Sequence, residues 1–449
     1  MSNDNAITTP TTYSNPKWVD ILHKAFTWLF RLIAGGTFIF SGFVKAIDPW
    51  GTIYKFGEYF EAMGISMLPS LTLTGVFGLC AIEFLVGIFL VLGIYRKSAP
   101  LLALAFMCVM LPLTLWIAVA DPVSDCGCFG DFLLISNWST FWKNVILTAI
   151  IIWLIKFNRD CTYLISPAFQ WLAVLFSAAF ILIISFVGYT DQPLLDFRPY
   201  TAGTELVIAG DDDNTADDAD NLVFVYEKDG QNREFGVDDE LPDESDGWKF
   251  VERRQKQNDA KLADPTHSGN KTFRIWNLNG DTDVTEEVML TENKTLVLMI
   301  PELKNVSPAT TWRINALYDW ADSHSVDMIA VVSGNAYEIM EWKDMSMPEY
   351  PIYTSDDTAI KEVVRGNPGV VMTDNNKIQW KTSLGAIDVE KFIRQSPDQG
   401  YGGYISDAKG FLHGTVYLYL IFMAIPVALS FMPSIYSLFT RDGKAHDEE

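Results

Sequence analysis

Six long apolar runs constrain this chain more than any other feature of its sequence. They cover residues 28–44, 71–95, 99–119, 141–157, 168–189 and 411–431. A bilayer core is crossed by about 20 mostly apolar helical residues, and six buried core helices of this kind would be unusual in a soluble protein. We therefore predict an α-helical polytopic membrane protein whose six spans contact the lipid bilayer.

Basic residues flank these spans on alternate sides. They are Lys17, Lys24 and Arg31 at span one, Arg96 and Lys97 between spans two and three, Lys156 and Arg159 after span four, and Arg441 and Lys444 after span six. The loops at 48–70 and 121–140 carry acids and few lysines. Because basic residues stay on the cytoplasmic side, we predict that both termini are cytoplasmic and that the 121–140 loop is outside. The polar first 20 residues predict no cleavable signal peptide.

The segment between spans five and six is strongly acidic. Residues 191–407 carry 42 of the 56 acidic residues but only 20 of the 33 basic ones, and they account for nearly all of the net charge of −23. Such a block will not bind nucleic acid or an anionic lipid surface. We expect it to give solubility and to recognise a basic protein partner. Within it, residues 210–220 (GDDDNTADDAD) predict a solvated linker, with a calcium loop as the alternative.

The second half of this block predicts an α/β domain. After a hairpin at "LVFVYEKDGQNREFGV", a buried strand (TLVLMIPEL), an amphipathic helix, a second buried strand (VDMIAVVSG) and a helix at 336–342 follow one another. Another helix, a turn at Asn367-Pro368-Gly369 and a hairpin complete a β-α-β-α-β-β order. This order resembles the thioredoxin fold, in which Pro368 would be the cis proline. The block has no cysteine, and "PELKNVSPA" stands where Cys-x-x-Cys is expected, which favours a recognition module.

Two charged residues lie inside or beside the first two spans. Glu83 is near the middle of span two, where an ionised carboxylate is costly unless it is paired. Lys45, at the outer end of span one, is its expected partner. Either the two form a buried ion pair that fixes helix packing, or they line a head-group cavity or relay protons beside the loop after span three.

That loop contains two cysteines in "DCGCFGD", residues 125–131. In an oxidising compartment Cys126 and Cys128 can form a disulfide, whose small ring is strained and therefore readily reduced. Gly127 tolerates the backbone angles that such a ring needs. Redox cycling, a static disulfide and a zinc site completed by Asp residues remain three alternatives, although no histidine lies near the loop.

The surroundings of the two thiols are expected to make them less reactive. Three aspartates, Asp121, Asp125 and Asp131, flank the pair, and nearby carboxylates raise the pKa of a thiol. Lys45 is the only cation that we expect nearby. The other cysteines lie in span two (Cys80, a buried packing residue or a resolving thiol), in span three (Cys108) and on the cytoplasmic side (Cys161). No nucleotide loop, serine triad or metal motif is present.

The first four spans resemble the DoxX/MauE superfamily of bacterial inner-membrane proteins. The matching features are Ser41-Gly42-Phe43-Val44-Lys45 with Asp48-Pro49, Glu83 with Gly87 and Gly93, and Asp125-Cys126-Gly127-Cys128-Phe129-Gly130. The chain also resembles longer members from Gram-negative bacteria, in which "LLDFRPYTAGTE" precedes a thioredoxin-like domain. The resemblance implies thiol–disulfide or quinone-linked redox chemistry at the membrane. Together with the pattern of basic residues, which places the acidic block in the periplasm, it makes a membrane quinone the expected electron partner.

Together these features give a domain plan and two functional hypotheses. The plan is a cytoplasmic segment (1–27), a four-helix DoxX/MauE-like module (28–160), a fifth helix (161–190), an acidic linker with strands (191–290), a thioredoxin-like domain (291–408), a sixth helix (409–440) and a tail (441–449). In the first hypothesis the protein is a thiol–disulfide/quinone oxidoreductase with Cys126, Cys128, Glu83 and Lys45 at its site. In the second it is a non-catalytic scaffold of an envelope complex that uses the cysteine-free domain to bind a periplasmic protein.

Overall fold

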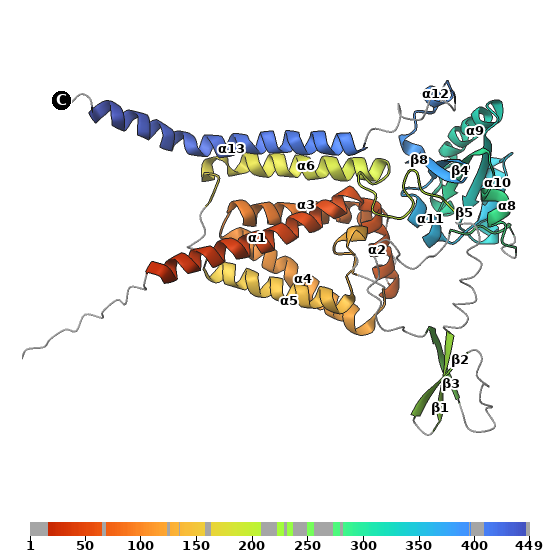
Figure 1. The fold of residues 1–449 in the computed structure, drawn as a ribbon, viewed down its shortest axis with the longest axis horizontal. Helices are drawn as coiled ribbons and strands as arrows, with labels where there is room; N and C mark the ends of the chain where they lie inside the picture. Colours follow the sequence, from red (N-terminus) through yellow and green to blue (C-terminus); the bar gives the residue numbers. More distant parts are fainter. Residues whose placement is uncertain are drawn as a thin grey trace, which may run out of the picture. The chain divides into compact units, whose positions relative to one another are not determined.

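The computed structural model divides the chain into two compact units. It describes residues 17–64, 69–123, 126–133, 135–157, 163–207, 222–228, 231–236, 249–255, 273–278, 282–394, 396 and 408–445. One unit comprises Met1–Phe197 with Gly402–Glu449, and the other comprises Arg198–Tyr401. We call them the membrane unit and the sheet unit (Figure 1).

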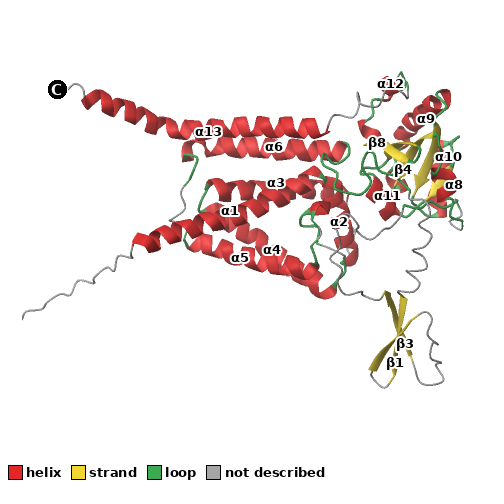
Figure 2. Cartoon of the chain, in the orientation of Figure 1, coloured by secondary structure: helices red, strands yellow, loops and turns green. Residues whose placement is uncertain are grey.

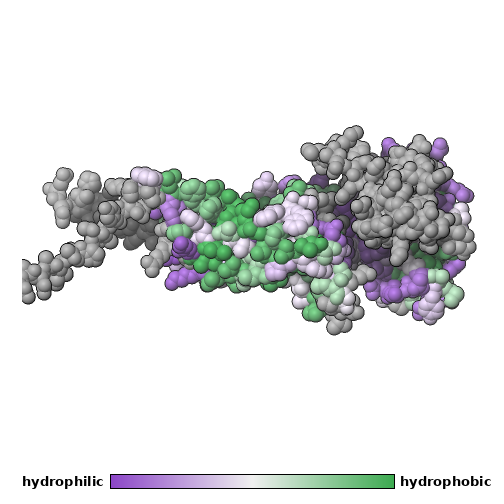
Figure 3. All heavy atoms as spheres, turned by 90° about the horizontal axis from the view of Figure 1, so that it is seen from below, coloured by the Kyte–Doolittle hydropathy of each residue, from purple (hydrophilic) through white to green (hydrophobic). Residues whose placement is uncertain are grey.

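Among the described residues, six helices of the membrane unit are long and apolar enough to cross a bilayer. They are α1 (Lys17–Ile47), α3 (Pro69–Leu92), α4 (Ser98–Ala120), α5 (Asn137–Lys156), α6 (Gln170–Thr190) and α13 (Ala408–Ala445). Each predicted span falls on one of these helices, so the prediction of six long apolar helices is confirmed. On the face drawn in Figure 3, hydrophobic residues cover the middle of the helical bundle.

The bundle is built from helix pairs. Helix α1 packs along α3, α4 along α5, and α6 along α13. Buried apolar side chains such as Phe38, Ile151 and Ile181 form the common core. The start of α1 and the end of α13 lie at one end of the bundle, and the loop after α4 lies at the other (Figure 1).

A helix that the sequence did not predict fills part of the 48–70 loop. Helix α2 (Pro49–Ala62) begins directly after Asp48, whose carboxylate accepts a hydrogen bond from the Gly51 amide at 2.9 Å. An Asp at the N-cap followed by Pro at the first helical position is a favoured helix start. Helices α1 and α13 also extend beyond the predicted segment boundaries at 27 and 440, and short 3₁₀ turns form at η1 (Gly130–Phe132) and η3 (Pro167–Phe169).

The sheet unit contains two sheets, and strands occur only in this part of the described chain (Figure 2). The smaller sheet has the order β2-β1-β3, from β1 (Leu222–Lys228), β2 (Gln231–Gly236) and β3 (Lys249–Gln255), all antiparallel. It contains the predicted hairpin and a third strand that was not predicted. The predicted linker at 210–220 lies outside the described residues.

The larger sheet has the order β6-β5-β4-β7-β8. Its strands are β4 (Lys294–Ile300), β5 (Asp327–Val332), β6 (Ile352–Thr354), β7 (Gly369–Asp374) and β8 (Lys377–Ser383). Strands β4, β5 and β6 run parallel, whereas β7 and β8 are antiparallel to their neighbours. Strand β6 is missing from the predicted order because three residues give no periodic signal.

Helices and turns complete the sheet unit. They are α8 (Thr285–Met289), η6 (Leu303–Asn305), α9 (Pro308–Ser323), α10 (Ala336–Ser346), α11 (Asp357–Val363), η7 (Leu384–Ala386) and α12 (Val389–Phe392). The sheet is therefore a small mixed sheet with helices, as the alternating pattern predicts. The Asn367–Pro368 peptide bond is cis, in line with the expectation for Pro368.

Candidate functional site

Glycines let α1 and α3 approach closely at the site. A Cβ atom on Gly42 would lie 2.6 Å from the backbone nitrogen of Phe84, and one on Gly87 would lie 2.5 Å from that of Ile39. Such contacts are too short for any larger residue, and small residues at crossings are how membrane helices bring their backbones together. The tight crossing places one face of α1 against the residue preceding Phe84, which is Glu83.

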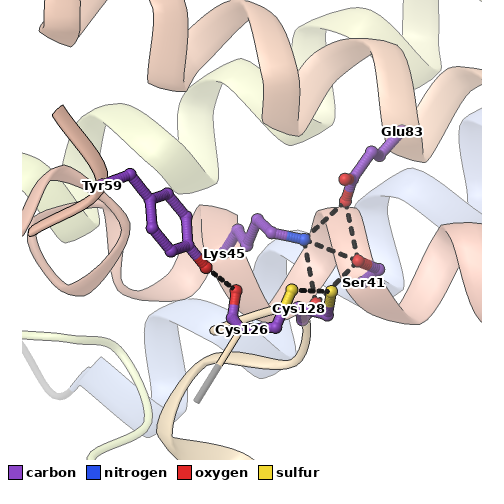
Figure 4. Close-up of polar contacts among 6 residues, drawn as sticks. All are labelled: Ser41, Lys45, Tyr59, Glu83, Cys126 and Cys128. Carbon is purple, nitrogen blue, oxygen red and sulfur yellow. Dashed lines mark hydrogen bonds and ion pairs between the residues drawn. The ribbon is translucent and has the colours of Figure 1, made fainter. Parts of the chain in front are cut away.

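Lys45 and Glu83 meet at this crossing as a buried ion pair (Figure 4). The Lys45 Nζ atom lies 2.8 Å from Glu83 Oε2, and both side chains are almost fully buried. Ser41, one turn before Lys45, accepts a hydrogen bond from Lys45 Nζ at 2.6 Å, and its hydroxyl lies 2.8 Å from Glu83 Oε2. The pairing that the sequence predicted is therefore present.

The same ion pair reaches the cysteine loop. Lys45 Nζ donates to the backbone carbonyl oxygen of Cys128 at 2.9 Å, and the Ser41 hydroxyl lies 2.8 Å from that oxygen. These contacts join span one to the loop after span three. The structure therefore brings together all four predicted site residues, Cys126, Cys128, Glu83 and Lys45, as Figure 4 shows.

The loop holds its two thiols side by side in an apolar setting. The Cys126 and Cys128 sulfurs are 2.9 Å apart, both cysteines are free, and both are buried. Gly127 has a φ of +61°, a value that favours glycine. Apolar side chains from α2 and α4 pack around the pair: Phe56, Tyr59, Met110, Leu113, Trp116 and Ile117, together with Val123. The hydroxyl of Tyr59 donates to the backbone carbonyl of Cys126.

The two thiols have different acidities. A hydrogen bond shared with Cys126, together with the charges of Lys143 and Lys45, lowers the pKa of Cys128 to about 6 despite its burial. The same hydrogen bond, followed by burial, raises the pKa of Cys126. A thiol with a lowered pKa is a thiolate at neutral pH, the form that reacts in disulfide exchange.

The expectation that Lys45 is the only nearby cation is wrong. The ammonium of Lys143, from α5, lies 4.1 Å from the centre of the Phe129 ring, and its charge lowers the pKa of both thiols. The sequence held a signal for it, because Lys143 is a cation within the fourth apolar run, just as Lys45 adjoins the first. Tyr59 was missed because the helix that carries it was not predicted.

The flanking aspartates do not set the acidity of the pair as expected. Asp121 accepts a hydrogen bond from Asn137 Nδ2 at 2.8 Å, and Asp131 is exposed in η1. Glu83 is the carboxylate that raises the pKa of Cys128, and the lysines outweigh it. Asp125 lies outside the described residues.

The remaining cysteines differ in their settings. Cys80 is buried in α3 and Cys108 is exposed on α4, whereas Cys161 lies outside the described residues. Within the described ranges, no group of three or more His, Cys, Asp or Glu side chains is placed to hold a metal ion.

Residues 23–157 match the family described as Methylamine utilisation protein MauE. This match takes in α1 to α5 and therefore all four predicted site residues, and with the six apolar helices it supports a membrane protein of the MauE/DoxX type. Residues 221–259, which include the smaller sheet, match a Domain of unknown function (DUF8463). No curated protein matches the chain.

Proposed function

We propose that this MauE/DoxX-like protein is a membrane thiol–disulfide redox component whose Cys126 and Cys128 cycle between dithiol and disulfide. The observation that carries the proposal is the contact between the loop and the buried ion pair. Two thiols 2.9 Å apart are tied through the Cys128 carbonyl to Lys45 and Glu83. The ammonium of Lys45 thus lies at the loop whose Cys128 carries negative charge when it is a thiolate.

A membrane quinone is the electron acceptor that fits this site. Apolar and aromatic side chains, including Phe56 and Trp116, pack against the cluster that contains both cysteines, and these suit a flat apolar ring. When bound, a quinone would take up two electrons and two protons as the dithiol becomes a disulfide. Phe56, Leu113 and Trp116 are the residues that would hold it.

Within this proposal, Lys45 and Glu83 have two tasks. Their ion pair holds the loop through the carbonyl of Cys128, and the carboxylate carries a proton to and from the site. Replacement Glu83→Gln keeps the size and hydrogen-bonding capacity of the side chain but removes the exchangeable charge. We expect this variant to accumulate in the membrane with its activity lost. Full activity would leave the pair with a packing role alone.

The same proposal places the cysteine loop on the outer face of a bacterial inner membrane. Both described chain ends, the start of α1 and the end of α13, lie at the opposite end of the bundle from the loop. The alternating basic loops favour cytoplasmic termini. A periplasmic loop would meet an oxidising compartment, in which a disulfide persists.

The redox state of the pair in isolated membranes tests the function directly. Thiol labelling across a glutathione series should reveal a readily reduced pair that is re-oxidised when quinone is supplied. The matched control is Cys126→Ser with Cys128→Ser, which should remove the titrating species and leave the labelling of Cys80 and Cys108 unchanged. A pair that never oxidises, or that stays oxidised under strongly reducing buffer, would eliminate redox cycling.

A second function has its own observation in the sheet unit. The five-stranded order with parallel β4-β5-β6 and antiparallel β7-β8 is consistent with a thioredoxin-like domain. The residue after Pro301, where a redox thioredoxin carries its cysteines, is Glu302, whose carbonyl accepts a hydrogen bond from Asn367 Nδ2 at 2.6 Å. We infer that this acidic domain binds a protein partner without thiol chemistry. A pure scaffold would keep its partners and phenotype in the double-serine variant, whereas a redox component would lose the phenotype.

A further inference from the structure

The two sides of the cysteine pair face different groups. On the Cys128 side, the backbone carbonyl accepts from the Lys45 ammonium at 2.9 Å, and the adjacent Phe129 ring lies under the Lys143 ammonium at 4.1 Å. On the Cys126 side, the backbone carbonyl accepts from the neutral hydroxyl of Tyr59. The two ammonium groups therefore lie beside Cys128 and Phe129, whereas the group that bonds to the Cys126 carbonyl is neutral.

The lysines near the loop differ in whether a carboxylate balances their charge. The charged groups around the loop are Lys45 on α1, Lys55 and Glu58 on α2, Glu83 on α3, Asp121 at the end of α4, Lys143 on α5 and Asp131 in η1. Lys45 is paired with Glu83 at 2.8 Å, and Lys55, whose stem lies beside Gly127, is paired with Glu58 at 2.9 Å. In the described part of the chain, Lys143 has a ring beneath it but no carboxylate partner.

We propose that Lys143 is a positioning residue that makes Cys128 the leaving sulfur of the disulfide, so that an incoming substrate thiolate attacks Cys126. The proposal deepens the redox function stated above and rests on it. A thiolate leaves more readily when a nearby cation stabilises its charge, and attack falls on the sulfur opposite the better leaving group. The substrate class is a protein or small molecule with two neighbouring thiols.

The exchange balances without a further reactant. The first substrate thiolate forms a bond to Cys126 Sγ, the Cys126–Cys128 bond breaks, and Cys128 leaves as a thiolate beside Lys143. The second substrate thiol then loses its proton and attacks the substrate sulfur of the mixed disulfide. The bond to Cys126 breaks, and Cys126 takes up the proton. The substrate has lost two electrons, and the protein holds a Cys128 thiolate and a Cys126 thiol.

The pKa values of the two thiols agree with Cys128 as the leaving sulfur and Cys126 as the attacked sulfur. The pKa of Cys128 lies below its ordinary value and that of Cys126 lies above it, so at pH 7 the reduced pair carries its negative charge on Cys128. Because the pKa of Cys128 is about 6, its thiolate persists above that pH and is lost as the pH falls below it. The proton remains on Cys126 throughout this range.

Limited alkylation of the reduced full-length protein in membranes tests the assignment. Single-hit iodoacetamide labelling at pH 5 to 8, followed by fragmentation mass spectrometry of the loop peptide, gives the ratio of Cys128 to Cys126 labelling. In the wild-type chain we expect a ratio of about tenfold or more at pH 7 that is no smaller near pH 5, while the absolute rate of Cys128 labelling falls as the pH drops through about 6. Lys143→Gln should lower the ratio at pH 7 at least about threefold, whereas Lys143→Arg should keep it.

Lys55→Gln is the matched control, because it removes a lysine that touches the loop but is already paired with Glu58. It should leave the ratio unchanged. A wild-type ratio of one at every pH would overturn the proposal without any variant. An unchanged ratio in Lys143→Gln would also overturn it. Failure of quinone to re-oxidise the pair, with the labelling ratio intact, would instead count against the proposed function and leave the assignment of the two thiols standing.

Discussion

The membrane unit and the sheet unit both enclose lysine side chains but give them different partners. In the sheet unit, Lys381 donates to the backbone carbonyls of Tyr200 and Val363 at 2.5 and 2.7 Å. In the membrane unit, Lys45 bonds to the carboxylate of Glu83 as well as to a carbonyl. The two contacts of Lys381 fix the chain, and in the membrane unit the lysine also pairs with a buried carboxylate.

Removal of the Glu83 carboxylate should have the largest effect on the stability of the membrane unit. Glu83→Leu leaves the Lys45 ammonium buried without its partner, which typically costs about 3–5 kcal/mol. Thermal unfolding in detergent should show this loss, and Glu83→Leu combined with Lys45→Met should restore most of it. Lys304→Gln, which removes the exposed lysine of a pair with Glu338 in the sheet unit, should leave unfolding unchanged. If the single and double variants at the buried pair unfold alike, the two charges are not coupled.

An intermediate effect is expected where α1 crosses α3. Gly42→Ala places a Cβ atom 2.6 Å from a backbone nitrogen of α3, so the helices must separate, at a cost of about 1–3 kcal/mol. The separation should also stretch the contact between Lys45 and Glu83 and make Cys128 more accessible to a thiol reagent. Gly36→Ala, on the same helix with open space at its Cβ position, is the control. Equal behaviour of the two variants would contradict the close crossing.

The smallest change in stability is expected from replacing a buried tyrosine, and one tyrosine from each unit provides the comparison. Tyr59→Phe removes the hydrogen bond to the Cys126 carbonyl and should destabilise the protein by about 1 kcal/mol, because that buried acceptor loses its donor. Tyr350→Phe in the sheet unit should be neutral or slightly stabilising, since among the described residues its buried hydroxyl has no partner. Unfolding midpoints for both variants provide the measurement. A loss at Tyr350 as large as that at Tyr59 would count against the role given to the Tyr59 hydrogen bond.

The sequence predicted the parts of this molecule that follow from composition and periodicity. Long apolar runs fix the six spans because a bilayer admits few other structures. A carboxylate in mid-span needs a cation, so Glu83 and Lys45 could be paired from their positions alone. Alternating buried strands and amphipathic helices likewise indicated a mixed sheet after residue 290.

What the sequence did not predict depends on which helix faces meet. Lys143 lies in a run with little difference between its faces, so nothing in the pattern indicated that it faces the loop. Tyr59 reaches the Cys126 carbonyl only because α2 folds back over the cysteines. The Asp48 cap starts this helix, and packing against α4 holds it there. The hydrogen bond between the Ser41 hydroxyl and Glu83 forms only because α1 and α3 lie very close together. Gly42 and Gly87 allow this close approach, but the presence of two glycines in a sequence does not by itself predict it.

Lys45 bonds to the backbone oxygen of Cys128 and not to its sulfur. The contact that holds the loop therefore does not depend on the thiol. Every amino acid offers that oxygen, so the loop keeps its anchor whatever side chain stands at position 128. Descendants of such a gene could exchange or lose the thiols by single substitutions without dismantling the membrane bundle. A chain of this kind can therefore change between a form with reactive thiols and a form without them. The residues at positions 126 and 128 distinguish the two forms, while Lys45 is the same in both.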